Sequence, residues 1–244
     1  MNRNYLIFDI RRTMRNRRVL IFSILMPLVL FMIFGLTIPK DASEGGISAI
    51  AYVMVSMAMF GSMSAAMSSG GVIAAERDGG WNRTLRLTPL KPQAYVVNKV
   101  ILSLLLAIPP LLCVFAFGMI FGHVHLSLTQ WLTVAAVSWL GALPFAAIGL
   151  VIGYIAKPDS VQPITGLSTM LIAAFGGLWL PVDQMPSVMK HIAQLTPAYW
   201  TGQSSRSALS QSGVDMNAVL VVLGWTIVLG FIALRRFRAD TARA

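Results

Sequence analysis

The sequence predicts an all-α integral membrane protein made of one domain, residues 1–244. We expect six transmembrane helices, an N-terminal amphipathic helix at the interface and short helices on the outer face. Apolar residues make up 56% of the chain and charged residues only 11%, and the mean hydropathy is +0.72. These values lie far outside the range of soluble domains. Uncharged runs of the roughly 20 residues that a membrane-crossing helix needs recur along the chain, and they are continuously apolar rather than alternating, which disfavours strands.

The first 18 residues predict a helix that lies along the cytoplasmic interface. Asp9, Arg12 and Arg15 lie away from the apolar side of the helical wheel, which carries Leu6, Ile7, Ile10 and Met14. A basic tail that only sets topology is the alternative. Basic residues before an apolar run are also typical of a signal peptide. The run here is about 20 residues long and ends in Thr37-Ile38-Pro39-Lys40 rather than at a small-residue cleavage site, so we reject that interpretation.

The six uncharged runs define the predicted spans. They cover residues 19–38, 47–75, 100–121, 131–156, 160–180 and 217–234. Spans one to five therefore occupy 19–180, an outer-face segment occupies 181–216, span six occupies 217–234 and a basic tail occupies 235–244. The fifth run is the least regular, because Gln162 and Pro163 lie near its start and the loop before it, 157–159, is very short.

The distribution of charge predicts the orientation. Segments 1–18, 76–99, 157–159 and 235–244 hold 16 of the 19 basic residues and a net charge of +11, whereas the alternate segments 39–46, 122–130 and 181–216 carry a net charge of −1. Because cytoplasmic loops are enriched in Lys and Arg, we expect a multi-pass protein of a bacterial-type cell membrane with both termini in the cytoplasm. Attraction to anionic lipids then explains the net charge of +10, and no nucleic-acid partner is expected.

The spans contain no residue typical of catalysis or proton coupling. None has Asp, Glu, Lys, Arg or His, which argues against a proton antiporter. The chain lacks a Gly-x-x-x-x-Gly-Lys-Ser/Thr loop, so we expect it to bind no ATP itself. Cys113 is interpreted as a core residue, and His123 and His125 have no nearby carboxylate or thiol in the sequence. We therefore expect neither a catalytic residue nor a metal or cofactor in this chain.

The segment 76–99 has the densest polar pattern in the sequence. Its fixed points are Glu76-Arg77, Gly80, Leu85, Thr88-Pro89 and Lys99. This spacing resembles the signature of the membrane subunits of ABC exporters of the type-2 permease family, which includes the daunorubicin-resistance permeases. Trp81 and Arg83 depart from it, because a Thr and an acidic residue are common at those positions.

The resemblance extends to the order of the elements along the whole chain. It implies a separate ATP-binding subunit that binds ATP and Mg and hydrolyses ATP in the cytoplasm. A helix over 80–87 would dock into that subunit through Trp81 and Leu85, and Thr88-Pro89 would end the helix. Glu76 and Arg77 would transmit its movement to the membrane. The alternative is that the segment is only a topology signal.

The resemblance also implies two permease copies around a two-fold axis. We expect a homodimer, with a heterodimer as the alternative.

In span two, Met59, Met63 and Met67 recur at i, i+4 and i+8, a pattern that fits either an adaptable wall of the substrate pathway or plain helix packing. The pairs Gly118-x-x-x-Gly122 and Gly149-x-x-x-Gly153 are expected to make packing contacts within the subunit.

These observations predict the permease subunit of an ATP-driven exporter. The uncharged spans favour a hydrophobic or amphipathic cargo such as a drug or antibiotic, and hence a role in drug-resistance efflux. Two alternatives remain open: a channel or carrier outside the ABC class, and an immunity or sensor subunit that transports nothing.

Overall fold

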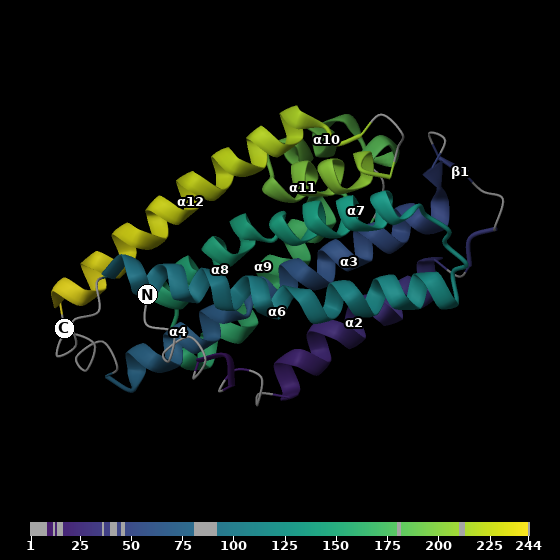
Figure 1. Cartoon of the computed structure of the whole chain (residues 1–244). Helices are drawn as coiled ribbons and strands as arrows, with labels where there is room; N and C mark the ends of the chain where they lie inside the picture. The colour runs from purple at the N-terminus through teal and green to yellow at the C-terminus, as the bar shows by residue number, and fades with distance from the viewer. Residues whose placement is uncertain are drawn as a thin grey trace.

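The computed structural model describes residues 9–11, 13, 17–35, 37–39, 43–44, 47–80, 92–179, 182–209 and 213–243. The described part is helical apart from one antiparallel pair of two-residue strands, β1 (Ser43–Glu44) and β2 (Ile47–Ser48), which the sequence did not predict (Figure 1). In chain order the helices are α2 (Arg17–Gly35), α3 (Ala49–Met67), α4 (Ser69–Asp78), α6 (Pro92–Ile120), α7 (Leu128–Leu140), α8 (Leu143–Ile155), α9 (Pro158–Phe175), the 3₁₀ turn η1 (Val182–Gln184), α10 (Ser187–Gln194), α11 (Pro197–Ser207) and α12 (Met216–Arg243).

Helices occupy all six runs that the sequence predicts as spans. The runs correspond to α2, to α3 with α4, to α6, to α7 with α8, to α9 and to α12. Within the described ranges, four stretches are long and apolar enough to cross a membrane: Ala49–Asp78, Ala94–Ile120, Leu128–Ile155 and Met216–Phe237. The stretch Ile21–Gly35 in α2 is apolar but shorter. Polar residues such as Gln162 in its first half keep α9 outside this set. The all-α class is confirmed, and the six-span layout stays a prediction.

The helices flanking the polar segment are longer than predicted. We expected Glu76 and Lys99 in a loop, but α4 continues to Asp78 and α6 already begins at Pro92. The stretch Ala49–Asp78 has 30 residues, which as a helix measures about 45 Å and exceeds the ~30 Å hydrocarbon core. Its last turns can therefore carry charge beyond the core. Gly80, with φ 71°, adopts the left-handed conformation that typically ends a helix just beyond α4.

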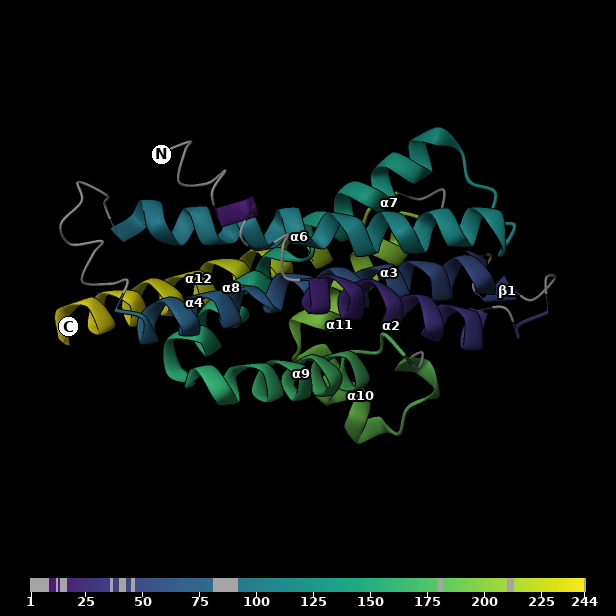
Figure 2. The ribbon, with the colours of Figure 1, turned by 90° about the horizontal axis from the view of Figure 1, so that it is seen from below.

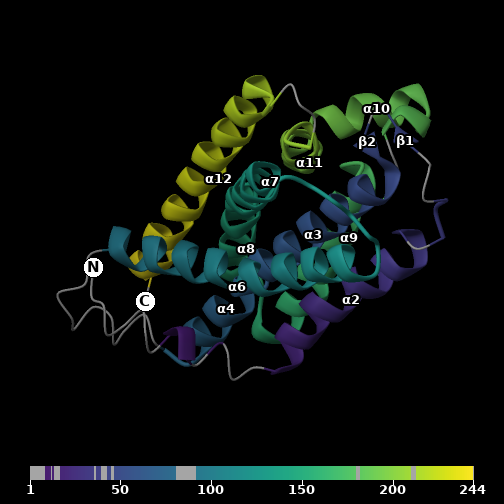
Figure 3. The ribbon, with the colours of Figure 1, turned by 45° about the vertical axis from the view of Figure 1, so that its right-hand side comes forward.

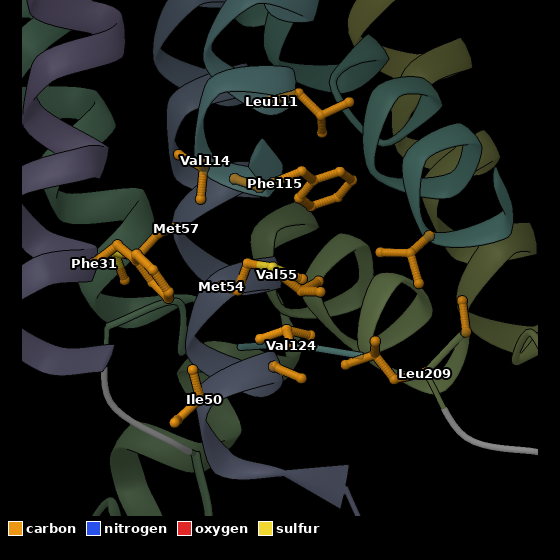
Figure 4. Close-up of a cluster of buried hydrophobic side chains, with 14 residues drawn as sticks. Phe31, Ile50, Met54, Val55, Met57, Leu111, Val114, Phe115, Val124 and Leu209 are labelled. Atoms are coloured by element: carbon orange, nitrogen blue, oxygen red, sulfur yellow. The ribbon is translucent and has the colours of Figure 1, made fainter. Parts of the chain in front are cut away.

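Helix α3 lies at the centre of the bundle and packs against α2, α6 and α8. Its N-terminal half contributes to a buried cluster in which side chains from α2, α3 and α6 converge, with Val124 and Leu209 from the connecting segments (Figure 4). Its C-terminal end and the start of α4 approach α8 at backbone distance. A Cβ placed on Gly149 would lie 2.6 Å from the carbonyl oxygen of Met67, and one placed on Gly153 would lie 2.6 Å from that of Gly70. The Gly149-x-x-x-Gly153 pair thus makes a packing contact within the subunit, as predicted.

The outer surface of the bundle is apolar. The side chains of Phe22 on α2, Leu112 on α6, Leu167 on α9 and Ile227 on α12 are each more than half exposed. A continuous apolar surface of this kind is rare on soluble monomers. It agrees with a multi-pass membrane protein whose helices face lipid.

The two helices of the predicted outer-face segment differ from each other. Helix α10 and the residue that follows it carry an exposed apolar side formed by Val188, Met189, Ile192 and Leu195. Helix α11 was also expected at the surface, but most of its residues are buried and it packs against α3, α7 and α12 (Figure 3). Its small residues, such as Ala198 and Gly202, allow this close approach.

Candidate functional site

Polar side chains meet where α4 ends and where α6 begins, at the end of the bundle that also holds the basic end of α12 (Figures 1 and 2). Lys99 Nζ lies 2.7 Å from Asp9 Oδ2 and 2.8 Å from Glu76 Oε1, and the Tyr95 hydroxyl donates a 2.6 Å hydrogen bond to Glu76 Oε2. All four residues are buried, Lys99 to 0% and Glu76 to 4% exposure. We call Asp9, Glu76, Tyr95 and Lys99 the Lys99 cluster.

The Lys99 cluster joins three parts of the chain. Burying a charge costs several kcal/mol unless it is paired and hydrogen-bonded. Here one ammonium group, with its three donors, bonds a carboxylate of the N-terminal segment and a carboxylate of α4. Because Lys99 itself belongs to α6, the N-terminal segment, α4 and α6 cannot separate without leaving charges buried and unpaired.

Aromatic side chains connect the Lys99 cluster to α12 and α8. The ring of Tyr95 stacks on Phe237 of α12, with centroids 5.2 Å apart, and Tyr154 of α8 meets the same phenylalanine edge to face at 5.8 Å. Ile73 and Leu150 complete this buried patch. The aromatic packing fixes the ring of Tyr95 and therefore the direction in which its hydroxyl donates to Glu76.

Arg77 binds a different helix from its neighbour Glu76. Its Nη1 donates to the carbonyl oxygens of Gly153 and Ala156, at 3.2 Å and 3.5 Å, in the last turn of α8 and its cap. Carbonyls at the end of a helix lack partners within the helix and carry partial negative charge, so a guanidinium is well suited to cap them. Consecutive residues of α4 therefore hold α6 and α8.

The predicted site residues are only partly brought together. Glu76 and Arg77 lie in the contacts just described, and Gly80 follows the end of α4. Trp81, Leu85, Thr88 and Pro89 lie outside the described residues, as does the docking helix expected over 80–87, apart from Gly80. The coupling role of these residues stays a prediction.

The methionine stripe of α3 lies inside the protomer. Met59, Met63 and Met67 are fully buried, in a cluster with Phe145 and Ala146 of α8. The hydroxyl of Thr169 on α9 donates to the Met67 sulfur at 3.4 Å. In this conformation the stripe contacts the chain's own helices, and its role in a substrate pathway stays a prediction.

The sequence did not indicate Asp9, Tyr95 and Lys99 as site residues, nor one buried arginine. Lys99 is a fixed point of the signature and a topology charge, but no contact was predicted for it, although Tyr95 lies four residues earlier on the same face of α6. Arg206 on α11 is only 6% exposed; its guanidinium lies 4.8 Å from the centre of the Tyr52 ring and Nη1 donates to Ser56 Oγ at 3.4 Å. No local pattern distinguishes Arg206 from a solvated arginine.

Within the part of the chain that the structure describes, no group of three or more His, Cys, Asp or Glu side chains could hold a metal ion. His123 and His125 are both exposed, and Cys113 is half-buried on α6.

Comparisons with known proteins agree with a helical membrane protein. Residues 5–210 match the family model described as ABC-2 type transporter. The chain is also 27% identical over 223 residues to "Putative transport permease YvfS" of Bacillus subtilis (strain 168), and the aligned region covers 91% of each protein.

Proposed function

Because this chain belongs to the ABC-2 type transporter family, we propose that it is the membrane subunit of an exporter driven by a separate ATPase. That partner binds ATP and Mg in the cytoplasm, and this chain supplies the path through the membrane. The observation that carries the proposal is the pair of contacts at the end of α4. Glu76 is bonded to Lys99 of α6, which also bonds Asp9 of the N-terminal segment, and Arg77 is bonded to α8, within four residues of the segment expected to dock.

These contacts support a route for mechanical coupling. A force applied to residues 81–91 reaches both α4, which ends at Asp78, and α6, which begins at Pro92. Charged contacts link α4 to α6 through Lys99 and pass the movement of α4 to α8 through Arg77. Helix α8 packs along α12, so movement at one short segment displaces much of the bundle.

We further propose six spans with both termini in the cytoplasm. The charge asymmetry of the sequence supports this orientation, because it places the Lys99 cluster and the basic end of α12 on the cytoplasmic side. Helix α10 would then lie in the outer interface, with Val188 and Ile192 toward the lipid and Lys190 among the headgroups.

The proposed assembly is a homodimer in which α9 faces the second copy. Helix α9 lies at the edge of the bundle (Figure 2). Gln162 on this helix is exposed, and a Cβ on Gly166 would meet no atom within 4 Å. The Gln162 amide lies close to Gly71 of α4, and its exposed side is better satisfied by a partner chain or a water-filled pathway than by hydrocarbon.

The same arrangement supports a hydrophobic or amphipathic cargo, such as a drug or antibiotic that is removed by efflux. Thr169 of α9 covers Met67, so outward movement of α9 would expose the methionine stripe to the space between two copies. Methionine side chains adapt to apolar molecules of different shapes. The pathway would then begin at Met67 and continue along Met63 and Met59.

Co-purification and flux together test the proposal. The chain is co-expressed with candidate ATPases, purified from membranes, reconstituted in vesicles and supplied with ATP and fluorescent lipophilic compounds. We expect an ATPase to co-purify and ATP to drive compound transport. Transport without an ATPase would indicate a channel or carrier, whereas a bound ATPase without transport would indicate a sensor or immunity subunit.

A further inference from the structure

The helix formed by α3 and α4 is interrupted at Ser68-Ser69-Gly70-Gly71, a segment that we call the weak point. Helix α3 ends at Met67 and α4 begins at Ser69. The Ser68 hydroxyl donates to Ala65 O at 2.7 Å, the Ser69 hydroxyl to Ala66 O at 2.9 Å, and the Gly71 N–H to Ser68 O at 3.0 Å. Serine hydroxyls that bond the preceding turn, together with consecutive glycines, bend helices and lower their stiffness.

Helix α4 is attached to α8 on both sides of Ile73. At the weak point the backbones touch, because Gly149 and Gly153 face Met67 and Gly70 without intervening side chains. Farther along, Arg77 bonds the last turn of α8. Helix α4 is therefore held to α8, as well as to α6 through Glu76, and any bend of α4 relative to α3 occurs between residues 68 and 71.

Asn98 of α6 lies opposite this weak point. Tyr95, three residues before it, bonds Glu76 of α4, and Leu102, four residues after it, packs with Ala65 of α3. Residues at these spacings share a helix face, and α3 and α6 run antiparallel, with Ser62 bonded to Ala107. The register of these contacts places Asn98 at the level of Ser69.

The Asn98 side chain is fully buried, and neither its Nδ2 nor its Oδ1 has a hydrogen-bond partner. Among the described residues whose every polar contact is known, no other side chain leaves two polar atoms buried and unpaired. An unpaired buried amide raises the free energy of the conformation that contains it. The unpaired Asn98 amide therefore raises the free energy of this conformation, and a different position of α4 that gives the amide a partner would lower it.

We propose that Asn98 is a positioning residue that is unpaired in this conformation and bonds the Ser69 hydroxyl in a second one. In the second conformation α4 has moved with α8 about residues 68–71, and Ser69 has exchanged its bond to Ala66 for one to Asn98. The inference rests on the proposed transport function. The pair formed by Asn98 and Ser69 keeps two positions of α4 close in free energy. Both side chains are 0% exposed, so water does not compete for this bond.

Replacing Asn98 by leucine tests the proposal through two readouts of opposite sign. Asn98→Leu removes the unpaired amide from the present conformation, so we expect the unfolding temperature of the full chain in nanodiscs to rise by about 2 to 4 °C. Because the second conformation loses its bond, we expect ATP-driven transport to fall by roughly tenfold, equivalent to one hydrogen bond. If Asn98 had a purely structural role, its replacement would lower both the unfolding temperature and transport.

Two further variants make the test specific. Ser69→Ala should reduce transport to a similar extent. The double variant, Asn98→Leu with Ser69→Ala, should transport no worse than either single variant, because each substitution removes the same bond between Asn98 and Ser69. Ser138→Ala on α7 removes another buried hydroxyl that has no partner, away from the weak point, and should leave transport unchanged. Independent, multiplicative losses in the double variant would contradict the pairing of Asn98 with Ser69.

A distance measurement reports the motion without any cargo. Spin labels at Ser48→Cys and Ala75→Cys, in a Cys113→Ser background and diluted with unlabelled chain, lie roughly 40 Å apart along a continuous helix. We expect two distances in the unaltered protein and one in Asn98→Leu. A single distance in both, or full transport by Asn98→Leu, overturns this inference. Absence of transport and of a bound ATPase in the unaltered protein instead overturns the proposed function.

Discussion

Lys99 is fully buried between two carboxylates, and the stability of this arrangement depends on all three charges. The ammonium group attracts Asp9 and Glu76, while the two carboxylates repel each other. Tyr95 reduces that repulsion by donating a hydrogen bond to Glu76. Removing the cation would therefore leave two buried negative charges facing one another, which is worse than removing the whole cluster.

At the scale of single residues we expect Lys99→Met to destabilise the chain by about 3 to 5 kcal/mol, the usual cost of breaking a buried ion pair from one side. Denaturant or thermal unfolding in detergent measures the change. A triple variant that adds Asp9→Asn and Glu76→Gln should recover most of the lost stability, because the two carboxylates that faced Lys99 are neutralised together with it. Unchanged stability of Lys99→Met would mean that the cluster is not buried in the membrane-embedded protein.

At the scale of elements, the positions of the helices follow from the sequence but their depth of burial does not. Helices α10 and α11 are neighbours of similar length, yet α10 is largely exposed and α11 is enclosed by α3, α7 and α12. The difference comes from side-chain size. Val188 and Ile192 give α10 a broad apolar face, whereas Gly202 and the serines of α11 let neighbouring backbones approach.

The contact between α8 and the end of α3 depends on glycine. We expect Gly149→Val to destabilise the protein by about 1 to 3 kcal/mol, because its side chain would collide with the backbone of Met67. Gly224→Ala on α12 is the matched control, since a Cβ there meets nothing within 4 Å. The control should be neutral or slightly stabilising. Equal unfolding temperatures for the two variants would contradict the close approach of α8 to Met67.

The segment that follows α4 is expected to dock on the ATPase. Trp81→Asp combined with Leu85→Asp would bury unpaired charge at that contact, at a cost of several kcal/mol. We expect the ATPase to be lost on purification and transport to stop, while the chain still inserts in the membrane. Val188→Asp with Ile192→Asp on α10 is the control and should retain the ATPase. A fully active complex of the Trp81 and Leu85 variant would exclude docking through these two side chains.

At the scale of the whole molecule, the charged ends of α4, α6 and α12 lie together and away from α10 and β1 (Figures 1 and 2). This separation agrees with the charge asymmetry along the sequence. In a Cys113→Ser background, Ser127→Cys should react with an impermeant thiol reagent in intact cells, and Ala239→Cys only after permeabilisation. The reverse labelling pattern would invert the proposed orientation.

The proposed dimer places the exposed side of α9 against a second copy. In the same Cys113→Ser background, we expect Gly166→Cys to form a disulfide-linked dimer in membranes under mild oxidation, because the two helices approach there without intervening side chains. Leu132→Cys is the control, because Leu132 is exposed on α7, which lies on the opposite side of the bundle from α9 in Figure 2, and this variant should stay monomeric on a non-reducing gel. Equal cross-linking of Gly166→Cys and Leu132→Cys would indicate random collisions between chains rather than a specific dimer interface.

The sequence by itself determined the membrane class, the six helical runs and the two glycine contacts of α8. These depend on local properties, the length of an apolar run and the spacing of small residues, which any packing of the helices must respect. The family follows equally from local spacing, because Glu76, Gly80, Leu85 and Pro89 occur within one short segment.

Only the tertiary structure decided which polar residues pair. Asp9, Glu76 and Lys99 are distant in sequence, and nothing local distinguishes them from charges that face solvent. Their pairing depends on where α4, α6 and the N-terminal segment meet, which is set by the packing of the whole bundle. The same holds for the burial of Arg206 and for the unpaired amide of Asn98, because partners are chosen by the distance between helices and not by position along the chain.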